Sequence, residues 1–186
     1  MNAAIQLAGV TKCFGERVAL NAISATIPTG GITGLVGPDG AGKSTLLRLL
    51  AGLLVPEAGE IRVLGLDPER EGDALRQRLG YMPQQFGLYE DLSVQENLSL
   101  YADLRGVLEP ERTPTLARLL AFTDLARFTA RPAGKLSGGM KQKLGLACAL
   151  LGTPDVLLLD EPGVGVDPIS RRALWQMVRE LAEGGM

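Results

Sequence analysis

The sequence contains no histidine, and this absence excludes several kinds of active site. With no imidazole in 186 residues, the chain cannot form a Ser-His-Asp triad, ligate zinc through histidine or use imidazole for acid–base catalysis. The only cysteines, Cys13 and Cys148, lie far apart and form no CxxC pair. They indicate neither a disulfide framework nor a zinc knuckle, and they fit a reducing compartment.

Long apolar runs and an excess of one charge are also lacking. The longest apolar stretch, residues 46–55, is interrupted by Arg48, and a membrane-spanning helix needs about 18 apolar residues. Asn2, Gln6 and Lys12 interrupt any apolar core of a secretory signal. With 19 basic and 21 acidic side chains the formal charge is −2, so no global field favours nucleic acid or an anionic membrane. We therefore expect a cytoplasmic protein that is not inserted in the bilayer and has no nucleic-acid partner.

Glycine is abundant, whereas aromatic residues are scarce. The chain has 24 glycines among 186 residues and only 4% aromatic residues, against an average glycine usage of about 7%. This composition predicts several places where bare backbone approaches another group closely. The length predicts a single domain.

The apolar periodicity predicts an α/β fold in which strands and helices alternate. The expected strands are residues 4–10, 18–27, 31–36, 60–64, 79–82 and 156–159. The expected helices are residues 46–53, 69–78 and 174–181, with a mainly helical stretch from 94 to 151. The first strand is expected to end at a turn at Thr11 and Lys12, and residues 156–159 read as a strand of a parallel sheet that is buried on both faces. We expect a core of residues 1–85 and 152–186, with a helical subdomain of residues 86–151 inserted into it.

A glycine-rich segment, GPDGAGKS, fits the phosphate-binding P-loop pattern between a predicted strand and a predicted helix. Glycines let successive backbone N–H groups surround phosphate oxygens, and the helix N-terminus adds its positive dipole. Lys43 offers a mobile charge to the β- and γ-phosphates, and the Ser44 hydroxyl is a candidate Mg²⁺ ligand. The alternative is a glycine-rich turn without a ligand. The residues assigned to this site are Gly37, Pro38, Asp39, Gly40, Ala41, Gly42, Lys43, Ser44 and Thr45.

Two acids follow the predicted strand 156–159. Ligands of open α/β sheets bind at the carboxyl ends of the strands. Asp160 is therefore a candidate Mg²⁺ ligand, and Glu161 is a candidate general base for an attacking water. The alternative is that the two acids simply mark a solvent-exposed strand end. The P-loop in the same chain favours the metal and base roles over this alternative.

The segment LSGGMKQ, residues 136–142, combines a helix cap with two glycines. Ser137 can cap the following helix, which alone would explain its presence. Gly138 and Gly139 each cost about 1 kcal/mol in a helix relative to alanine. They therefore favour a second exposed helix N-terminus that contacts an anion.

These motifs, with Gln84 in GYMPQQ and the segment VGVDP at 164–168, resemble an ATP-binding-cassette (ABC) nucleotide-binding domain over nearly the whole chain. The resemblance is strongest to the ATP-binding subunit of ABC-2-type multidrug exporters. Residues 80–105 and 157–177 resemble the first of two fused cassettes. The resemblance to this family implies a RecA-like P-loop NTPase fold with a parallel sheet core, an antiparallel N-terminal β portion and an inserted α-helical subdomain.

The same resemblance implies roles for individual residues. It places adenine on Phe14 and the ATP phosphates on residues 37–45. It places Mg²⁺ among Ser44, Gln84 and Asp160, with Glu161 as the general base and Lys43 and Gln84 as further catalytic residues. Ser137, Gly138 and Gly139 would contact the γ-phosphate of ATP held by a second cassette, and Asp167 would lie in the loop that crosses this interface. Phe14 packed only on the sheet remains the alternative for that residue.

The implied function is that of an ATPase that energises an ABC-2-like membrane transport complex, typical of multidrug efflux. Its partners would be ATP with Mg²⁺, a second cassette, and transmembrane permease subunits that dock near residues 86–91, on the inner face of the membrane. One alternative is a nucleotide-gated clamp with little hydrolysis of its own. The other is a soluble ABC ATPase outside transport, against which the lack of a long coiled coil and of a basic surface argues.

The sequence departs from the family pattern at three places. Asp39 stands where asparagine is commoner, and Gly163 stands where threonine or serine is frequent. The family's switch histidine and a further core strand would follow Met186. We therefore expect that the C-terminal part of the core is missing, and that either this chain is a fragment of a longer cassette or the cassette hydrolyses ATP poorly.

Overall fold

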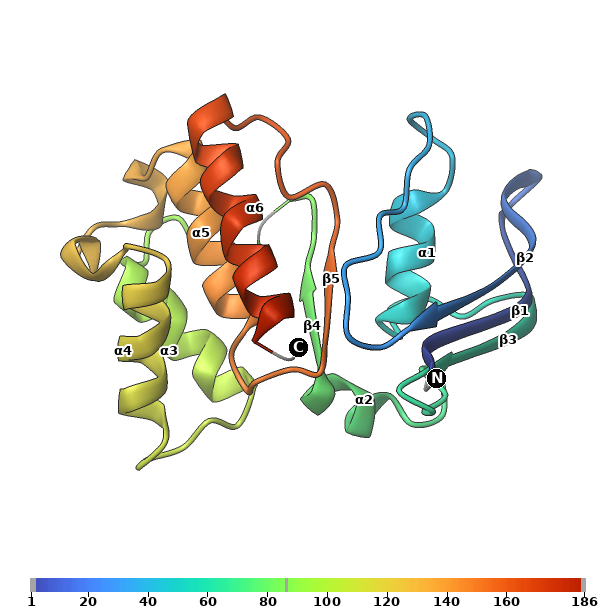
Figure 1. Ribbon diagram of the computed structural model, residues 1–186, viewed down its shortest axis with the longest axis horizontal. Helices are drawn as coiled ribbons and strands as arrows, with labels where there is room; N and C mark the ends of the chain where they lie inside the picture. The colour runs from blue at the N-terminus through green and yellow to red at the C-terminus, as the bar shows by residue number, and fades with distance from the viewer. Residues whose placement is uncertain (1–2, 86, 185–186) are drawn as a thin grey trace.

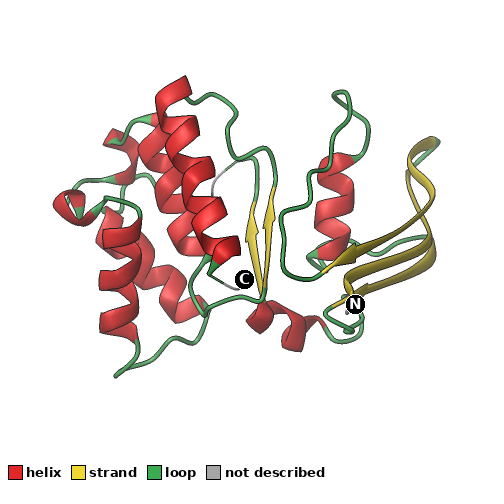
Figure 2. Cartoon of the chain, in the orientation of Figure 1, coloured by secondary structure: helices red, strands yellow, loops and turns green. Residues whose placement is uncertain are grey.

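The computed structural model describes residues 3–85 and 87–184, and its N-terminal part is an antiparallel sheet. Strands β1 (Ala3–Phe14), β2 (Arg17–Pro28) and β3 (Ala58–Val63) pair in the order β2-β1-β3. This sheet forms one end of the molecule (Figures 1 and 2). The two predicted strands of the hairpin are confirmed.

The predicted turn at Thr11 and Lys12 is wrong. Strand β1 continues to Phe14, because Thr11 pairs with Ala58 of β3 and Lys12 pairs with Leu20 of β2. The chain turns only at residues 15–16. Both residues of the predicted turn therefore belong to a strand.

Helix α1 (Lys43–Leu50) packs on this sheet. Its buried face carries Leu46, Leu49 and Leu50, which are spaced as the predicted helix requires. Together with β1 and β3 these leucines form the N-terminal core, which also takes in Leu79 of β4 and Leu158 of β5.

A second, parallel sheet joins the two halves of the sequence. Helix α2 (Gly72–Arg78) leads into β4 (Leu79–Met82), which pairs with β5 (Val156–Leu159). Side chains alternate across this sheet. Tyr81 and Leu158 face the N-terminal core, whereas Met82 and Leu159 face a core built mainly by helices.

Two expectations about the parallel sheet are wrong. Residues 31–36 form no strand, and the Val36 side chain is 93% exposed. Strand β5 pairs with β4 alone among the described strands, and only Leu158 in it is buried. An apolar run forms a strand only where its backbone pairs with a neighbouring strand. Among the described residues, residues 31–36 pair neither with β5 nor with another strand.

Helices cover the other face of the parallel sheet. They are α3 (Val94–Leu104), α4 (Arg112–Phe122), α5 (Gly138–Ala149) and α6 (Pro168–Glu183), with the short 3₁₀ turns η1 (Ala126–Phe128) and η2 (Ala133–Lys135). The predicted helical character of residues 94–151 is confirmed. Helix α3 begins at a capping box in which Ser93 and Glu96 satisfy each other's backbone N–H groups. The division into a core and a subdomain of residues 86–151 stays a prediction, since the helical core also contains Met82 and Leu174.

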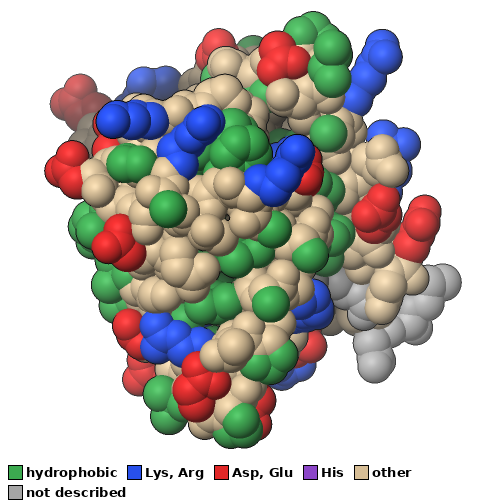
Figure 3. Space-filling model, turned by 90° about the vertical axis from the view of Figure 1, so that its left-hand side faces the viewer, with side chains coloured by type: hydrophobic (Ala, Val, Ile, Leu, Met, Phe, Trp, Pro, Cys, Tyr) green, Lys and Arg blue, Asp and Glu red, His purple; other side chains and the backbone are tan. Residues whose placement is uncertain are grey.

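The surface over these helices carries charges of both signs. Figure 3 shows Lys and Arg side chains interspersed with Asp and Glu side chains and with scattered apolar ones. Across residues 3–85 and 87–184, no helix combines the length and the apolar character that a bilayer crossing requires.

Candidate functional site

The glycine-rich loop forms a tight turn in front of α1. Gly40 and Gly42 have φ angles of 76° and 88°, a region that favours glycine. A side chain on Gly42 would also approach the Ala19 carbonyl oxygen of β2 to 2.5 Å. The loop therefore needs glycine here both for its conformation and for its close packing on β2.

Lys43 lies at the centre of this loop. Its Nζ donates hydrogen bonds to the carbonyl oxygens of Gly37 and Pro38, at 3.0 Å each. The same Nζ lies 3.5 Å from Glu161 Oε1 and 4.0 Å from Asp39 Oδ1. The loop thus wraps around a largely buried ammonium group, with one carboxylate on the sheet side and one in solvent.

Ser44 and Asp160 connect the first turn of α1 to the end of β5. The Ser44 hydroxyl donates to Asp160 Oδ1 at 2.9 Å. Asp160 is 2% exposed, and its backbone N–H donates to the Met82 carbonyl oxygen at 2.9 Å. The Asp160 carboxylate is therefore held by a side chain of α1, and the Asp160 backbone is held by the backbone of β4.

Glu161 lies between Lys43 and Gln84. Its Oε2 accepts a hydrogen bond of 3.1 Å from Gln84 Nε2, while its Oε1 faces the Lys43 ammonium. Glu161 has a φ angle of 50°, which is uncommon for a residue with a side chain and concentrates at functional sites. The structure thus brings together the predicted residues Lys43, Ser44, Gln84, Asp160 and Glu161.

The donor set at this point suits a magnesium ion bound together with phosphates. Mg²⁺ takes oxygen ligands and is usually held by one or two protein groups, with phosphates and waters completing the octahedron. The Ser44 hydroxyl and the Asp160 carboxylate supply such oxygens side by side. Among the described residues, no three Asp, Glu, Cys or His side chains gather closely enough to cage a metal by themselves.

The predicted base-stacking residue, Phe14, lies at the tip of the β1–β2 hairpin and is half-exposed. Arg17 pairs with Phe14 across the hairpin, and the sequence did not predict it as a residue of the site. A methyl group on Gly40 would lie 3.2 Å from Arg17 Nη2, so the guanidinium reaches the loop. Arg17 belongs to no motif, and only the pairing of the hairpin brings it there.

Ser137, Gly138 and Gly139 begin helix α5, away from the loop. Ser137 caps the helix by accepting a hydrogen bond of 3.3 Å from the Met140 N–H. Ser137 and Gly138 are exposed, whereas Gly139 is buried. A side chain on Gly139 would meet the Ser170 Cβ and Oγ at 2.5 Å. Gly139 is therefore needed for the close approach of α5 and α6, a reason that the sequence did not reveal.

Asp167 caps helix α6. Its Oδ1 accepts hydrogen bonds from the N–H groups of Ile169 and Ser170, at 3.0 Å each. A hydrogen bond with the Ser170 side chain, and after it the backbone hydrogen bonds from Ser170 and Ile169, lower the pKa of the Asp167 carboxyl group. The loop of residues 161–167 thus runs from Glu161 to a helix cap beside α5.

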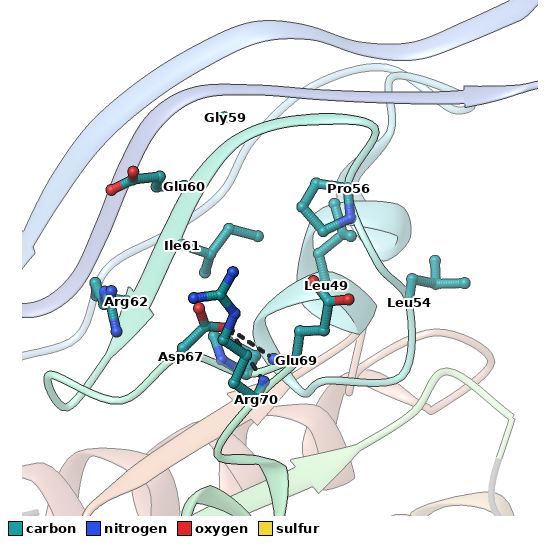
Figure 4. Close-up of a pocket in the computed structure, with 11 residues that line it drawn as sticks. Leu49, Leu54, Pro56, Gly59, Glu60, Ile61, Arg62, Asp67, Glu69 and Arg70 are labelled. Carbon is teal, nitrogen blue, oxygen red and sulfur yellow. Dashed lines mark hydrogen bonds between the residues drawn. The ribbon is translucent and has the colours of Figure 1, made fainter.

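A pocket of about 290 Å³ lies elsewhere, between β3 and the segment that follows it. Asp67 accepts hydrogen bonds there from the backbone N–H groups of Glu69 and Arg70, and Ile61 lines its wall (Figure 4). The pocket contains none of the predicted site residues. The arrangement around Lys43 therefore remains the candidate site.

Comparisons with known proteins show the family to which the chain belongs. The family model described as ABC transporter matches residues 20–164. The chain is 64% identical to the probable multidrug ABC transporter ATP-binding protein YbhF of Escherichia coli strain K12, over all of this chain and 32% of that protein. It is 40% identical to the Nod factor export ATP-binding protein I of Rhizobium sp. strain N33, over 98% of this chain and 60% of that protein. The chain thus spans about a third of the first relative and less than two thirds of the second.

Solved structures give the same result. The fold matches MJ1267, an ATP-binding cassette of an ABC transporter, with a TM-score of 0.90 and 27% identity over 100% of this chain and 79% of that one. It matches the dimeric post-hydrolysis state of the cassette MJ0796, bound to ADP and Pi, with a TM-score of 0.83 and 30% identity over 97% of this chain and 84% of that one. The expected P-loop NTPase fold is confirmed. By sequence and by fold, this chain belongs to the ABC transporter family and is an ATP-binding cassette.

Proposed function

We propose that this chain binds and hydrolyses MgATP and that it energises a membrane export complex. The observation that carries the proposal is the convergence of Lys43 and Ser44 of the loop with Asp160 and Glu161, which follow β5 more than a hundred residues away. Such a convergence is what triphosphate chemistry requires, because phosphate, metal and attacking water must be held together.

The loop of residues 37–45 would hold the phosphates. Its turn leaves backbone N–H groups at the start of α1, where the helix dipole favours an anion. The Lys43 ammonium already lies inside the turn. Phe14, at the hairpin tip, would stack on the base.

Ser44 and Asp160 would hold Mg²⁺, with Gln84 as a further ligand from the end of β4. When bound, this ion neutralises developing charge on the phosphate oxygens. The hydrogen bond between Ser44 and Asp160 sets the spacing of the two oxygens before any ion enters.

Glu161 would act as the general base. In hydrolysis, a water oxygen attacks the γ-phosphorus, the bond to the bridging oxygen of ADP breaks, and the water proton passes to the carboxylate. Gln84 and Lys43 bracket Glu161 and so orient it. The φ angle of 50° at Glu161 directs this side chain out of the line of β5.

A second cassette would complete the site. The cap of α5 at Ser137 exposes backbone N–H groups at a helix N-terminus, which suits the γ-phosphate of ATP held by the partner. Asp167 and the loop before it would cross the interface between the two. The dimeric MJ0796 structure, bound to ADP and Pi, supports this arrangement.

The membrane partner would be an ABC-2-type permease, with the cassette on the inner face of the membrane. The names of the relatives, one a probable multidrug transporter protein and one a Nod factor export protein, support export. The expected docking surface is residues 86–91, of which Phe86 lies outside the described residues. Within it, Glu90 forms an ion pair of 2.7 Å with Lys141 on α5, which would link the docked permease to the helix that begins at Ser137.

The test is a MgATP titration and a turnover measurement on the full-length protein. We expect saturable binding that Lys43→Ala abolishes, and turnover that Glu161→Gln reduces at least 100-fold, as expected for loss of a general base. Binding with unchanged turnover in Glu161→Gln would favour the nucleotide-gated clamp. Co-purification with ribosomes rather than with membranes would favour an ABC ATPase outside transport.

A further inference from the structure

Glu57, which belongs to none of the family motifs, holds the end of β1 from the turn between α1 and β3. Its Oε1 accepts a hydrogen bond of 2.7 Å from Lys12 Nζ, and its Oε2 accepts one of 2.9 Å from the Cys13 N–H. Lys12 Nζ also donates to the Val55 carbonyl oxygen at 2.8 Å. One carboxylate thus binds a side chain and the neighbouring backbone of β1 at once.

The position of Glu57 follows from where β3 begins. The last pair between the two strands joins Thr11 to Ala58, so the Cys13 N–H lies beyond the start of β3 and has no strand partner there. The Glu57 N–H donates to the Thr11 carbonyl oxygen at 2.9 Å, and its carboxylate then takes the place of the missing strand for Cys13. The side chain thereby extends the pairing by two residues toward the hairpin tip.

We call the contacts of Glu57 with Lys12 and Cys13 the Glu57 clamp. Phe14 follows Cys13 directly in the sequence. The Lys12 ammonium, whose side chain is only 14% exposed, lies 5.5 Å from the centroid of the Phe14 ring, within the range of a cation–π contact. The Phe14 side chain is nevertheless half-exposed. One side of the ring is therefore occupied by a fixed cation, while part of the ring stays open to solvent.

The contacts of Glu57 favour the ionised form of its carboxyl group. The hydrogen bond from Lys12 and then the backbone hydrogen bond from Cys13 lower the pKa of Glu57. Neither Lys12 nor Glu57 contacts the loop around Lys43 in any hydrogen bond or ion pair among the described residues. The clamp therefore acts on the hairpin tip and not on the phosphate-binding loop.

We infer that Glu57 is a positioning residue for base recognition: through Lys12 and Cys13 it fixes the Phe14 ring so that a purine base stacks on the open face. The inference rests on the proposed function, because it concerns the base of the nucleotide whose phosphates bind at Lys43. Since an immobilised ring loses less rotamer entropy when the base binds, breaking the clamp costs affinity for the base alone.

The experiment compares ATP with inorganic tripolyphosphate, both with Mg²⁺, as ligands of the full-length protein by calorimetry. Glu57→Ala and Lys12→Met each should raise the Kd for ATP about fivefold to twentyfold, the size of effect typical of a stacked base, and leave the Kd for tripolyphosphate unchanged. Glu57→Gln keeps an acceptor for the Cys13 N–H and should fall between wild type and Glu57→Ala. The matched control is Glu60→Ala, which removes an exposed carboxylate from β3, three residues further on.

Phe14→Ala separates the inference from the proposed function. In the Phe14→Ala background Glu57→Ala should add little, because residues that act through one another are not additive. Equal loss for ATP and tripolyphosphate in Glu57→Ala would overturn the inference, and so would an unchanged Kd for ATP. In both of those cases, binding that depends on Lys43 leaves the proposed function standing, whereas absence of such binding in the wild type overturns the proposed function itself.

Discussion

The Ser44 hydroxyl donates a hydrogen bond of 2.9 Å to Asp160 Oδ1, across 116 positions of sequence. Ser44 lies on α1, whose leucines pack in the N-terminal core, whereas Asp160 follows β5, whose Leu159 side chain packs against the helical core. Together with the ion pair between Lys43 and Glu161, this contact fixes how the loop of residues 37–45 lies relative to the two acids. The metal-binding capacity of the site should therefore depend on both residues together.

Ser44→Ala should reduce the affinity for ATP in the presence of Mg²⁺ about tenfold, close to 1.4 kcal/mol, and leave metal-free ATP binding nearly unchanged. The reason is that the hydroxyl serves the ion and not the phosphates. Titrations with Mg²⁺ and with EDTA make the measurement, and Ser99→Ala on α3 is the control. Equal losses in both titrations would contradict a metal role for Ser44.

Asp39→Asn should keep or tighten ATP binding, by a few-fold at low salt. The Asp39 side chain is fully exposed, and its Oδ1 lies 4.0 Å from Lys43 Nζ, so it lowers the positive potential where phosphate would bind.

Arg17→Gln should weaken ATP binding, because the guanidinium lies against Gly40 of the same loop. Nucleotide titrations at 50 mM and 500 mM KCl should show both effects shrinking as salt rises, and clearly weaker binding by Asp39→Asn would refute the electrostatic account.

Gly139→Ala should lower the free energy of unfolding by about 1–3 kcal/mol. The new methyl group would approach the Ser170 side chain to 2.5 Å and force α5 away from α6. Urea denaturation followed by circular dichroism measures the change. Gly138→Ala is the matched control, because its methyl group would meet only the Gly165 carbonyl oxygen, at 3.3 Å; similar losses for both variants would argue against the packing role.

Alkylation should distinguish the two cysteines of the native protein. Burial raises the pKa of Cys148 to about 12, so at pH 8 only about one thiol in 10,000 is ionised there. Cys13 is partly accessible. Iodoacetamide at pH 8 should modify Cys13 and spare Cys148 until urea unfolds the chain, as peptide mass spectrometry would reveal, and modification of Cys148 in the native state at a similar rate would contradict its burial.

The sequence predicts the site better than it predicts the sheet around it. Lys43, Ser44, Asp160 and Glu161 lie in short motifs whose backbone geometry is local, and the α/β pattern places the two motifs at one sheet edge. Their convergence therefore follows from the sequence. The strand expected at residues 31–36 does not form. A strand needs a partner strand, and the apolar character of a segment does not show whether a partner is present.

Other features depend on contacts between distant segments. Thr11 and Lys12 resemble a turn in sequence, and only their pairing with Ala58 and Leu20 makes them part of a strand. The close approach of Gly139 to Ser170 depends on how α6 packs against α5, which the motif around Gly139 does not indicate. The reach of Glu57 to Cys13 spans 44 positions, and no periodic pattern encodes such a distance.

The two-stranded sheet of β4 and β5 separates the two hydrophobic cores, with Tyr81 turned to one and Met82 to the other. Each strand is four residues long, and Gln84 and Glu161, which lie two positions beyond the strand ends, are joined by a hydrogen bond. Glu161 also pairs with Lys43 of α1, so a tilt of α1 against the sheet would change the surroundings of its carboxylate. The environment of the Glu161 carboxylate is in this way sensitive to how the two halves of the cassette pack on each other.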